Sequence, residues 1–150
     1  MGNKNQLIFP NSRSPFLMEF LESLKKRSKA LKHKTSSLTC ERVLTEHDGR
    51  RLERIDVEIT PGFSASKSFP CSFKLWEDRW ISISLCEWKN ETWDWNWQEE
   101  GTILPVIDGQ GLVSAIEATI SSSFEMNSSK ISLFSEMWRP YLARSPELAK

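Results

Sequence analysis

The sequence predicts an α+β fold in which a five-stranded antiparallel meander sheet has helices from both chain ends packed on one face. Two observations support this fold class. Apolar residues recur at three- and four-residue steps near both ends of the chain, whereas between residues 39 and 100 they recur at every second residue. Because the helical patterns are grouped at the ends, one sheet and one helical layer are favoured over a parallel α/β fold. A chain of 150 residues is the usual size of a single domain.

The first predicted helix spans residues 14–34, and we expect residues 1–13 to be poorly ordered. Ser14 is a suitable N-cap, and Pro15 occupies the first helical position, where its missing N–H has no cost. A single apolar stripe follows, formed by Phe16, Leu17, Phe20, Leu21, Leu24 and Leu31. This stripe is the surface expected to pack on the rest of the protein.

Strands are expected across residues 39–100. Asp48-Gly49 is a hairpin signal, because both residue types tolerate a positive φ angle. Pro61 ends the second strand, and further turns are expected at residues 77–79 and 89–91. Each of the five strands is therefore expected to lie beside the next one in the chain.

Helices are expected again in residues 108–145. Asp108 is a candidate N-cap for a helix that directs Leu112, Val113, Ile116 and Ile120 toward the core. A further short helix fits residues 129–138, with Ile131, Phe134 and Trp138 on one face, and Pro140 closes it.

Composition excludes several classes of protein. With 39% hydrophobic and 27% charged residues, the chain is neither collagen-like nor a low-complexity or membrane sequence. The N-terminus lacks the pattern of a secretory signal, so we expect a cytoplasmic location. Three cysteines without Cys-x-x-Cys spacing predict reduced thiols and neither a disulfide framework nor a zinc site. We expect no cofactor and no metal.

Charge and tryptophan are unevenly distributed along the chain. Residues 1–38 carry a net charge of +6, much of it in the run 25–34. Residues 76–100 carry −5 and hold six of the seven tryptophans. The basic run has two interpretations that the sequence leaves open: a solvated helix end whose lysines complement the helix dipole, or an anion-binding patch.

Alternation along strands separates the tryptophans into two sets. Trp93, Trp95 and Trp97 alternate with polar residues, so we expect them to form a buried face under the helices. Trp76, Trp80 and Trp88 are expected on the opposite, exposed face. A β-bulge near Asp78 or Glu87 would reverse this assignment.

The sequence offers little for catalysis. His33 lies in the basic run, where we expect it to be solvated. His47 lies beside the first hairpin turn, seven residues from Cys40, and this odd separation places the two on opposite faces of a strand, so they form no local dyad. An enzyme that uses Asp56 and Glu58 is a third, weaker hypothesis, because alternate acidic residues on a strand are usually its solvated side. We therefore predict a non-catalytic binding protein.

The predicted partner-binding surface combines aromatic anchors with carboxylates. It consists of Trp76, Asp78, Trp80, Trp88, Glu91, Asp94 and Asn96. Tryptophans supply desolvated anchors in protein interfaces, and carboxylates accelerate encounter with a basic partner.

A single cytosolic domain with the acidic, Trp-rich segments Trp76–Trp80 and Glu91–Trp97 and no catalytic set resembles, in general type, the bacterial immunity proteins that neutralise polymorphic toxins. The resemblance implies one-to-one binding of a cognate protein toxin with a basic active-site surface, and no membrane or nucleic-acid partner on the acidic face. The alternative is a small-ligand or carbohydrate-binding module in which Trp76, Trp80 and Trp88 stack on a sugar or base.

Overall fold

The computed structural model describes residues 9–33, 35–61, 70–89, 91–123 and 136–143, and for residues 36, 61, 86–89, 93–99 and 121–123 it describes the backbone alone. The elements are α1 (Pro15–Lys26), α2 (Ser28–Lys32), β1 (Thr35–His47), β2 (Arg50–Pro61), β3 (Cys71–Trp76), β4 (Trp80–Lys89), β5 (Thr92–Ile103), α3 (Gly109–Ser123), the 3-10 helix η1 (Arg139–Tyr141) and β6 (Leu142–Ala143).

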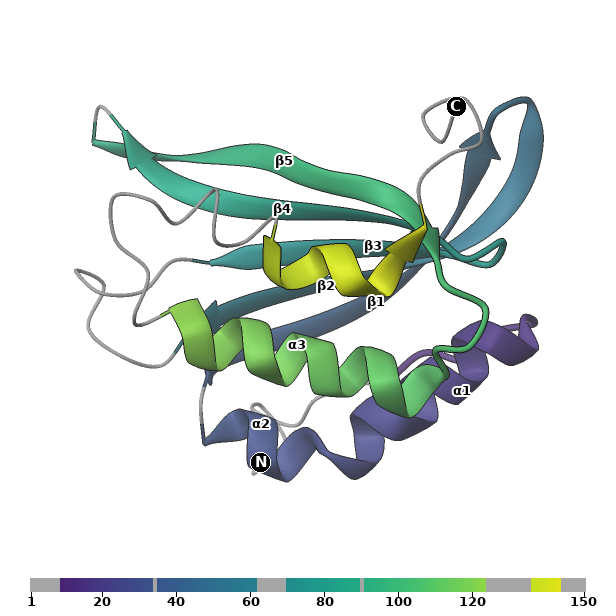
Figure 1. Ribbon diagram of the computed structural model, residues 1–150, viewed down its shortest axis with the longest axis horizontal. Coiled ribbons are helices and arrows are strands. Elements are labelled where there is room, and N and C mark those ends of the chain that lie inside the picture. Colours follow the sequence, from purple (N-terminus) through teal and green to yellow (C-terminus); the bar gives the residue numbers. More distant parts are fainter. Residues whose placement is uncertain (1–8, 34, 62–69, 90, 124–135, 144–150) are drawn as a thin grey trace, which may run out of the picture.

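The strands form one antiparallel sheet in the order β1-β2-β3-β4-β5-β6, and the helices lie along one side of it (Figure 1). The predicted α+β class and meander are confirmed. The sheet has six strands instead of five, because Leu142 and Ala143 pair with Ile103 and Thr102. A two-residue strand is too short to produce an alternation signal in the sequence.

The N-terminal helix starts where the sequence predicts. The Ser14 hydroxyl accepts a hydrogen bond from the backbone N–H of Leu17 at 3.2 Å, and Pro15 follows it. The predicted single helix is divided at Arg27, whose φ of −100° and ψ of 6° leave the helical region. Its guanidinium pairs with Glu117 of α3, so the break is tied to the neighbouring helix.

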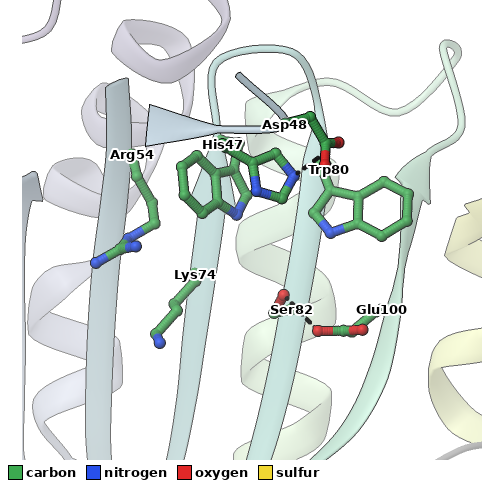
Figure 2. A pocket seen from close by; sticks show the side chains of 8 residues that line it. His47, Asp48, Arg54, Lys74, Trp80, Ser82 and Glu100 are labelled. Atoms are coloured by element: carbon green, nitrogen blue, oxygen red, sulfur yellow. Dashed lines mark hydrogen bonds and ion pairs between the residues drawn. The ribbon is translucent and has the colours of Figure 1, made fainter. Parts of the chain in front are cut away.

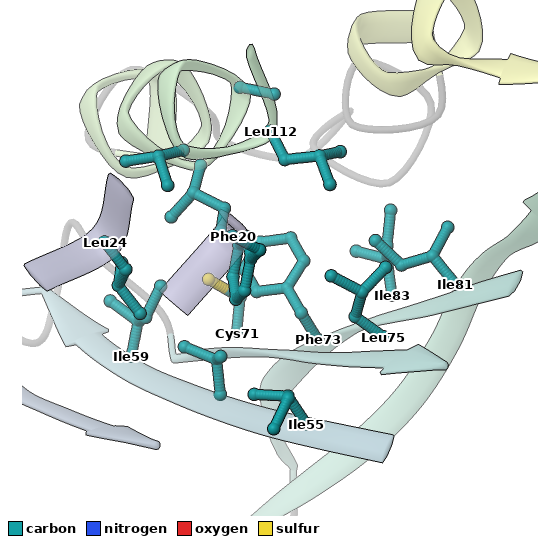
Figure 3. Packing of buried hydrophobic residues seen from close by; sticks show 14 of the residues in the cluster. Phe20, Leu24, Ile55, Ile59, Cys71, Phe73, Leu75, Ile81, Ile83 and Leu112 are labelled. Carbon is teal, nitrogen blue, oxygen red and sulfur yellow. The ribbon is translucent and has the colours of Figure 1, made fainter. Parts of the chain in front are cut away.

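The apolar core lies between the sheet and the helices (Figure 3). We call the sheet surface that carries Ile55, Phe73 and Ile83 the inner face. These three side chains are at most 1% exposed, and they pack in one cluster with the apolar stripe of α1 and with Leu112 and its neighbours on α3. The opposite surface, which carries Arg54, Lys74 and Ser82, is called the outer face.

Glycine is required where α3 begins beside α1. A Cβ atom at Gly109 would lie 2.6 Å from the backbone of Glu19 and Phe20, a distance that real Cβ contacts do not show. The predicted N-cap is confirmed, since the Asp108 carboxylate accepts the N–H of Gly111 at 2.8 Å. The first turn of α3 is therefore fixed against the middle of α1.

Little of the second predicted C-terminal helix lies in the described residues. Residues 136–138 form a helical turn that continues into η1, whereas Ile131 and Phe134 lie outside the described residues. Trp138 is 1% exposed, donates its indole N–H to Thr119 at 2.8 Å and packs on Phe73. The C-terminal segment thus completes the inner core.

The backbone register changes the predicted assignment of the tryptophans on β5. A shift between Ile83 and Ser84 leaves Gln98 without a β4 partner, after which Trp97 pairs with Ser84 and Trp95 with Cys86. Positions 93, 95 and 97 therefore lie on the same face of the sheet as Ser84, which is the outer face. The prediction that these positions form the face under the helices is wrong. The cause is a β-bulge, placed on β5 instead of near Asp78 or Glu87.

Candidate functional site

The outer face contains a pocket of about 350 Å³. The sheet register explains its lining, because Lys74 on β3 pairs with Ser82 on β4, which pairs with Glu100 on β5. The next row toward the β1–β2 turn carries Arg54 opposite Trp76, with Trp80 across β4. The remaining lining residues, His47 and Asp48, come from that turn (Figure 2).

The tip of the β1–β2 hairpin forms one wall of the pocket. Asp48 and Gly49 have φ angles of 53° and 75°, as the predicted tight turn requires. The hairpin extends past the last pair between β2 and β3, Arg54 with Trp76, and it bends away from the helices (Figure 1). His47 consequently stacks on the indole of Trp76, with ring centroids 4.3 Å apart.

Trp76 is buried, which corrects the prediction that it is exposed. It lies on the predicted face of the sheet, but only 6% of its surface is accessible. Besides His47, the guanidinium of Arg54 lies 4.9 Å from the ring centroid. Trp76 is therefore a packed wall of the pocket, and it contacts both His47 and Arg54.

Trp80 is the aromatic side chain that remains available in the pocket. It is partly exposed, and its ring lies 6.4 Å from His47 in a tilted arrangement. Its backbone N–H donates to the carboxylate of Asp78, which also pairs at 2.9 Å with Arg50 of the β1–β2 hairpin. Trp80 thus follows a turn in which Asp78 binds both the Trp80 backbone and Arg50.

Both signs of charge meet in this pocket. Arg54 pairs with Asp56 through two hydrogen bonds of 2.5 and 2.8 Å, and Lys74 lies beside it. On the opposite side the Ser82 hydroxyl donates to the Glu100 carboxylate at 3.2 Å. The arrangement provides an aromatic surface with donors on one wall and carboxylate acceptors on the other.

The predicted partner-binding residues are only partly brought together. Trp76, Asp78 and Trp80 lie at one end of the sheet. Trp88 lies near the other end of β4, in register with Trp93, and Glu91 lies in the turn beyond it with a φ of 64°. Asp94 pairs with Glu87, and Asn96 pairs with Leu85. Positions 94 and 96 therefore lie on the opposite face of the sheet from position 88.

Sequence reasoning missed several residues that line the pocket: His47, Asp48, Arg54, Lys74 and Glu100. The alternation that groups Lys74 and Ser82 with the tryptophans was visible in the sequence. The bend of the hairpin, which adds His47, left no signal in the local residue pattern.

A second polar cluster, on the edge of the inner face, ties the chain start to the sheet. Glu53 is fully buried and accepts hydrogen bonds from the Ser12 hydroxyl at 2.6 Å and the Arg13 N–H at 3.1 Å, and Arg42 pairs with it. Residues 12 and 13 were expected to be poorly ordered, so this docking is a correction. Glu77 accepts the backbone N–H of Glu53 and pairs with Arg13.

The pKa of Glu53 reflects two opposed effects. Burial alone would raise it, but the hydrogen bonds from Ser12, Arg42 and Arg13 outweigh burial and lower the pKa below the ordinary value of 4.5. The pKa of Glu77 is lowered in the same way, by the N–H of Glu53 and by Arg13 against the opposing effect of burial. All their partners belong to the scaffold, so we assign this cluster to stability.

The described thiols are poor nucleophiles. Burial raises the pKa of Cys71 to about 12, and burial together with the charge of Asp56 raises that of Cys40 to about 12. Among the residues that the structure describes, no three His, Cys, Asp or Glu side chains are grouped so that they could hold a metal ion. None of the described helices has the length and apolar character needed to cross a membrane.

Comparison with known proteins adds no functional information. Models of protein families, curated proteins and solved structures were each searched, and none of the three searches returned a match.

Proposed function

We propose that this chain is a non-catalytic binding protein whose outer-face pocket takes a small polar ligand of the carbohydrate class. The observation that carries the proposal is the partly exposed ring of Trp80 in a pocket of about 350 Å³ that is also lined by Trp76 and by charged and hydroxyl side chains. This volume lies at the lower end of the range of roughly 300–1,000 Å³ for ligand sites, which limits the ligand to one or two sugar rings.

The lining matches the chemistry of a sugar. A pyranose ring has a flat apolar face of C–H groups and a rim of hydroxyls that both donate and accept. Trp80 offers a surface for the apolar face, Glu100 accepts from hydroxyls, and Lys74 donates to them. The stacked pair of His47 and Trp76 keeps the wall in place before a ligand arrives, which reduces the entropy lost on binding.

Titration calorimetry and tryptophan fluorescence against a panel of neutral and acidic mono- and disaccharides test this proposal. We expect saturable binding of at least one sugar, and Trp80→Ala should weaken it about tenfold or more. Glu58→Gln is the control, since Glu58 is exposed on β2 and does not line the pocket. A panel without saturable binding, or a Trp80→Ala protein that binds like the wild type, would contradict the proposal.

A second candidate function is toxin neutralisation, as in the bacterial immunity proteins that the sequence resembles. The observation that favours it is the β4–β5 hairpin, whose pairing continues from Cys86 with Trp95 to Lys89 with Thr92, beyond the last pair of β3 with β4 (Figure 1). This two-stranded arm carries Trp88 and Trp93 next to Glu87 and Asp94 in sequence. Such a composition suits the basic surface of a nucleic-acid-cleaving toxin.

Co-expression with the product of an adjacent toxin-like reading frame tests this second function. The wild-type chain should restore growth, and Asp94→Lys should slow association with the toxin steeply at low salt. Glu58→Lys makes the same charge change outside the arm and should associate normally. If the toxin kills equally with and without the wild-type chain, this toxin is excluded as the partner. That result would not bear on sugar binding through Trp80.

A further inference from the structure

We propose that β1 is a self-pairing edge, through which two copies of this chain join their sheets in an antiparallel register centred on Leu44. The strand order places β1 at the edge of the sheet, and β1 is 13 residues long. A long edge strand presents a row of backbone donors and acceptors that favours pairing with another strand.

The backbone of Leu44 points to the outside of the sheet, away from the other described strands. Leu44 is opposite Glu53 on β2. The backbone groups of Glu53 are directed to the other side, because its carbonyl accepts the N–H of Glu77 at 2.9 Å and its N–H donates to the Glu77 side chain at 2.6 Å. Leu44 and Glu53 are thus a non-hydrogen-bonded pair, so the N–H and C=O of Leu44 are directed away from β2.

Side-chain chemistry selects the register. When Leu44 of one copy lies opposite Leu44 of the other, residues equally far before and after Leu44 face each other. Arg42 then lies opposite Glu46, and Glu41 lies opposite His47. Each of these two pairs occurs twice by symmetry. Arg42 and Glu46 carry opposite charges, and opposite charges directly across from one another stabilise paired strands.

Exposure is consistent with this pairing. Leu44 is one of two large hydrophobic residues that are exposed among the described residues, at 38%, and Glu41, Arg42 and Glu46 are also exposed. Pairing would place the two Leu44 side chains together between the two Arg42–Glu46 pairs. The edge therefore has an apolar centre with charged groups on both sides, as small self-complementary interfaces do.

Neighbouring registers lose these contacts. A register centred on Val43 places Arg42 opposite Leu44, and one centred on Thr45 places Leu44 opposite Glu46. Both bring an apolar side chain against a charged one. The occupant that fits this edge is accordingly a second copy of the same strand.

Sedimentation equilibrium of the full chain tests the proposal. We expect a reversible monomer–dimer equilibrium that weakens at high salt. Glu46→Arg replaces two attractive pairs by two repulsive ones and should raise the dissociation constant roughly tenfold. Glu58→Arg, which changes an exposed charge on β2, should leave it unchanged.

Leu44→Pro separates self-pairing from folding. Proline removes an N–H that does not take part in the β1–β2 ladder, and edge strands accept proline at such positions. This variant should keep the circular dichroism spectrum of the wild type and sediment as a monomer. A wild-type chain that stays monomeric at about 1 mM would overturn the proposal. A dimer that neither Glu46→Arg nor Leu44→Pro weakens would also overturn it, since another surface would then form the dimer.

Discussion

The two faces of the sheet use neighbouring residues for different purposes. On β3, Phe73 is 1% exposed and lies in the helix-covered core, whereas Lys74, the next residue, lines the pocket on the outer face. The inner face is apolar and covered by helices, and the outer face carries charged residues together with Trp76 and Trp80 and is covered in part by the tip of its own hairpin. Most of the buried apolar side chains therefore lie on the inner face, whereas the outer face carries the residues that line the pocket.

The largest loss of stability is expected when one large side chain is removed from the inner face. Phe73→Ala should lower the free energy of unfolding by about 3–5 kcal/mol, because Phe73 is fully buried and packs on Trp138. Lys74→Ala, one residue further, should change it by less than about 1 kcal/mol. Urea unfolding followed by circular dichroism measures both, and similar losses for the two variants would contradict the division between the faces.

Tryptophan substitutions on the outer face give the next largest effect. Trp76→Ala should cost about 3 kcal/mol, since it removes the surface on which His47 and Arg54 rest. Trp80→Ala should cost about 1 kcal/mol, because its ring is already partly exposed. Thermal unfolding of both variants tests the order. If Trp80→Ala proves the more destabilising, Trp80 is structural and the pocket loses its aromatic site.

Glu53→Gln tests the polar cluster that joins the chain start to the sheet. Loss of the carboxylate leaves Arg42 without its partner and should cost about 2 kcal/mol at neutral pH. Because the pKa of Glu53 is lowered in the folded state, its contribution is present above the ordinary value of 4.5 and is lost as the pH falls through the lowered value. Glu53→Gln should therefore lose less stability than the wild type on acidification. Glu58→Gln is the control. If the Glu53→Gln protein loses stability on acidification as the wild type does, Glu53 does not control the acid transition.

Local patterns in the sequence predicted the elements of the fold. Ser14 and Asp108 cap helices as expected, and Asp48-Gly49 forms the predicted turn, because each depends on residues within four positions of one another. The bulge at Gln98 escaped prediction, since it depends on how β5 pairs with β4. It reversed the faces assigned to positions 93, 95 and 97.

The candidate site was harder to predict than the fold. Alternation correctly placed Trp76 and Trp80 on the outer face, but exposure depends on what lies above that face. His47 is 29 positions before Trp76 in the chain, and it reaches the ring only because the hairpin bends over the sheet. A buried carboxylate such as Glu53 was equally hidden, because an acidic residue on a strand is usually solvated.

The smallest expected effect concerns the turn that lets the hairpin cover the outer face. Gly49 has a φ of 75°, and an added Cβ would meet no atom within 4 Å, so the cost of Gly49→Ala comes from backbone conformation alone. We expect a loss of about 1 kcal/mol. Asp48→Asn should change stability by less than about 0.5 kcal/mol, because asparagine also tolerates a positive φ. Amide hydrogen exchange should show faster opening of β1 near His47 in the Gly49→Ala protein, with the inner strands unchanged. If amide exchange at Phe73 is accelerated equally, the hairpin and the core open together. The hairpin tip would then not cover the outer face as a unit that opens independently of the core.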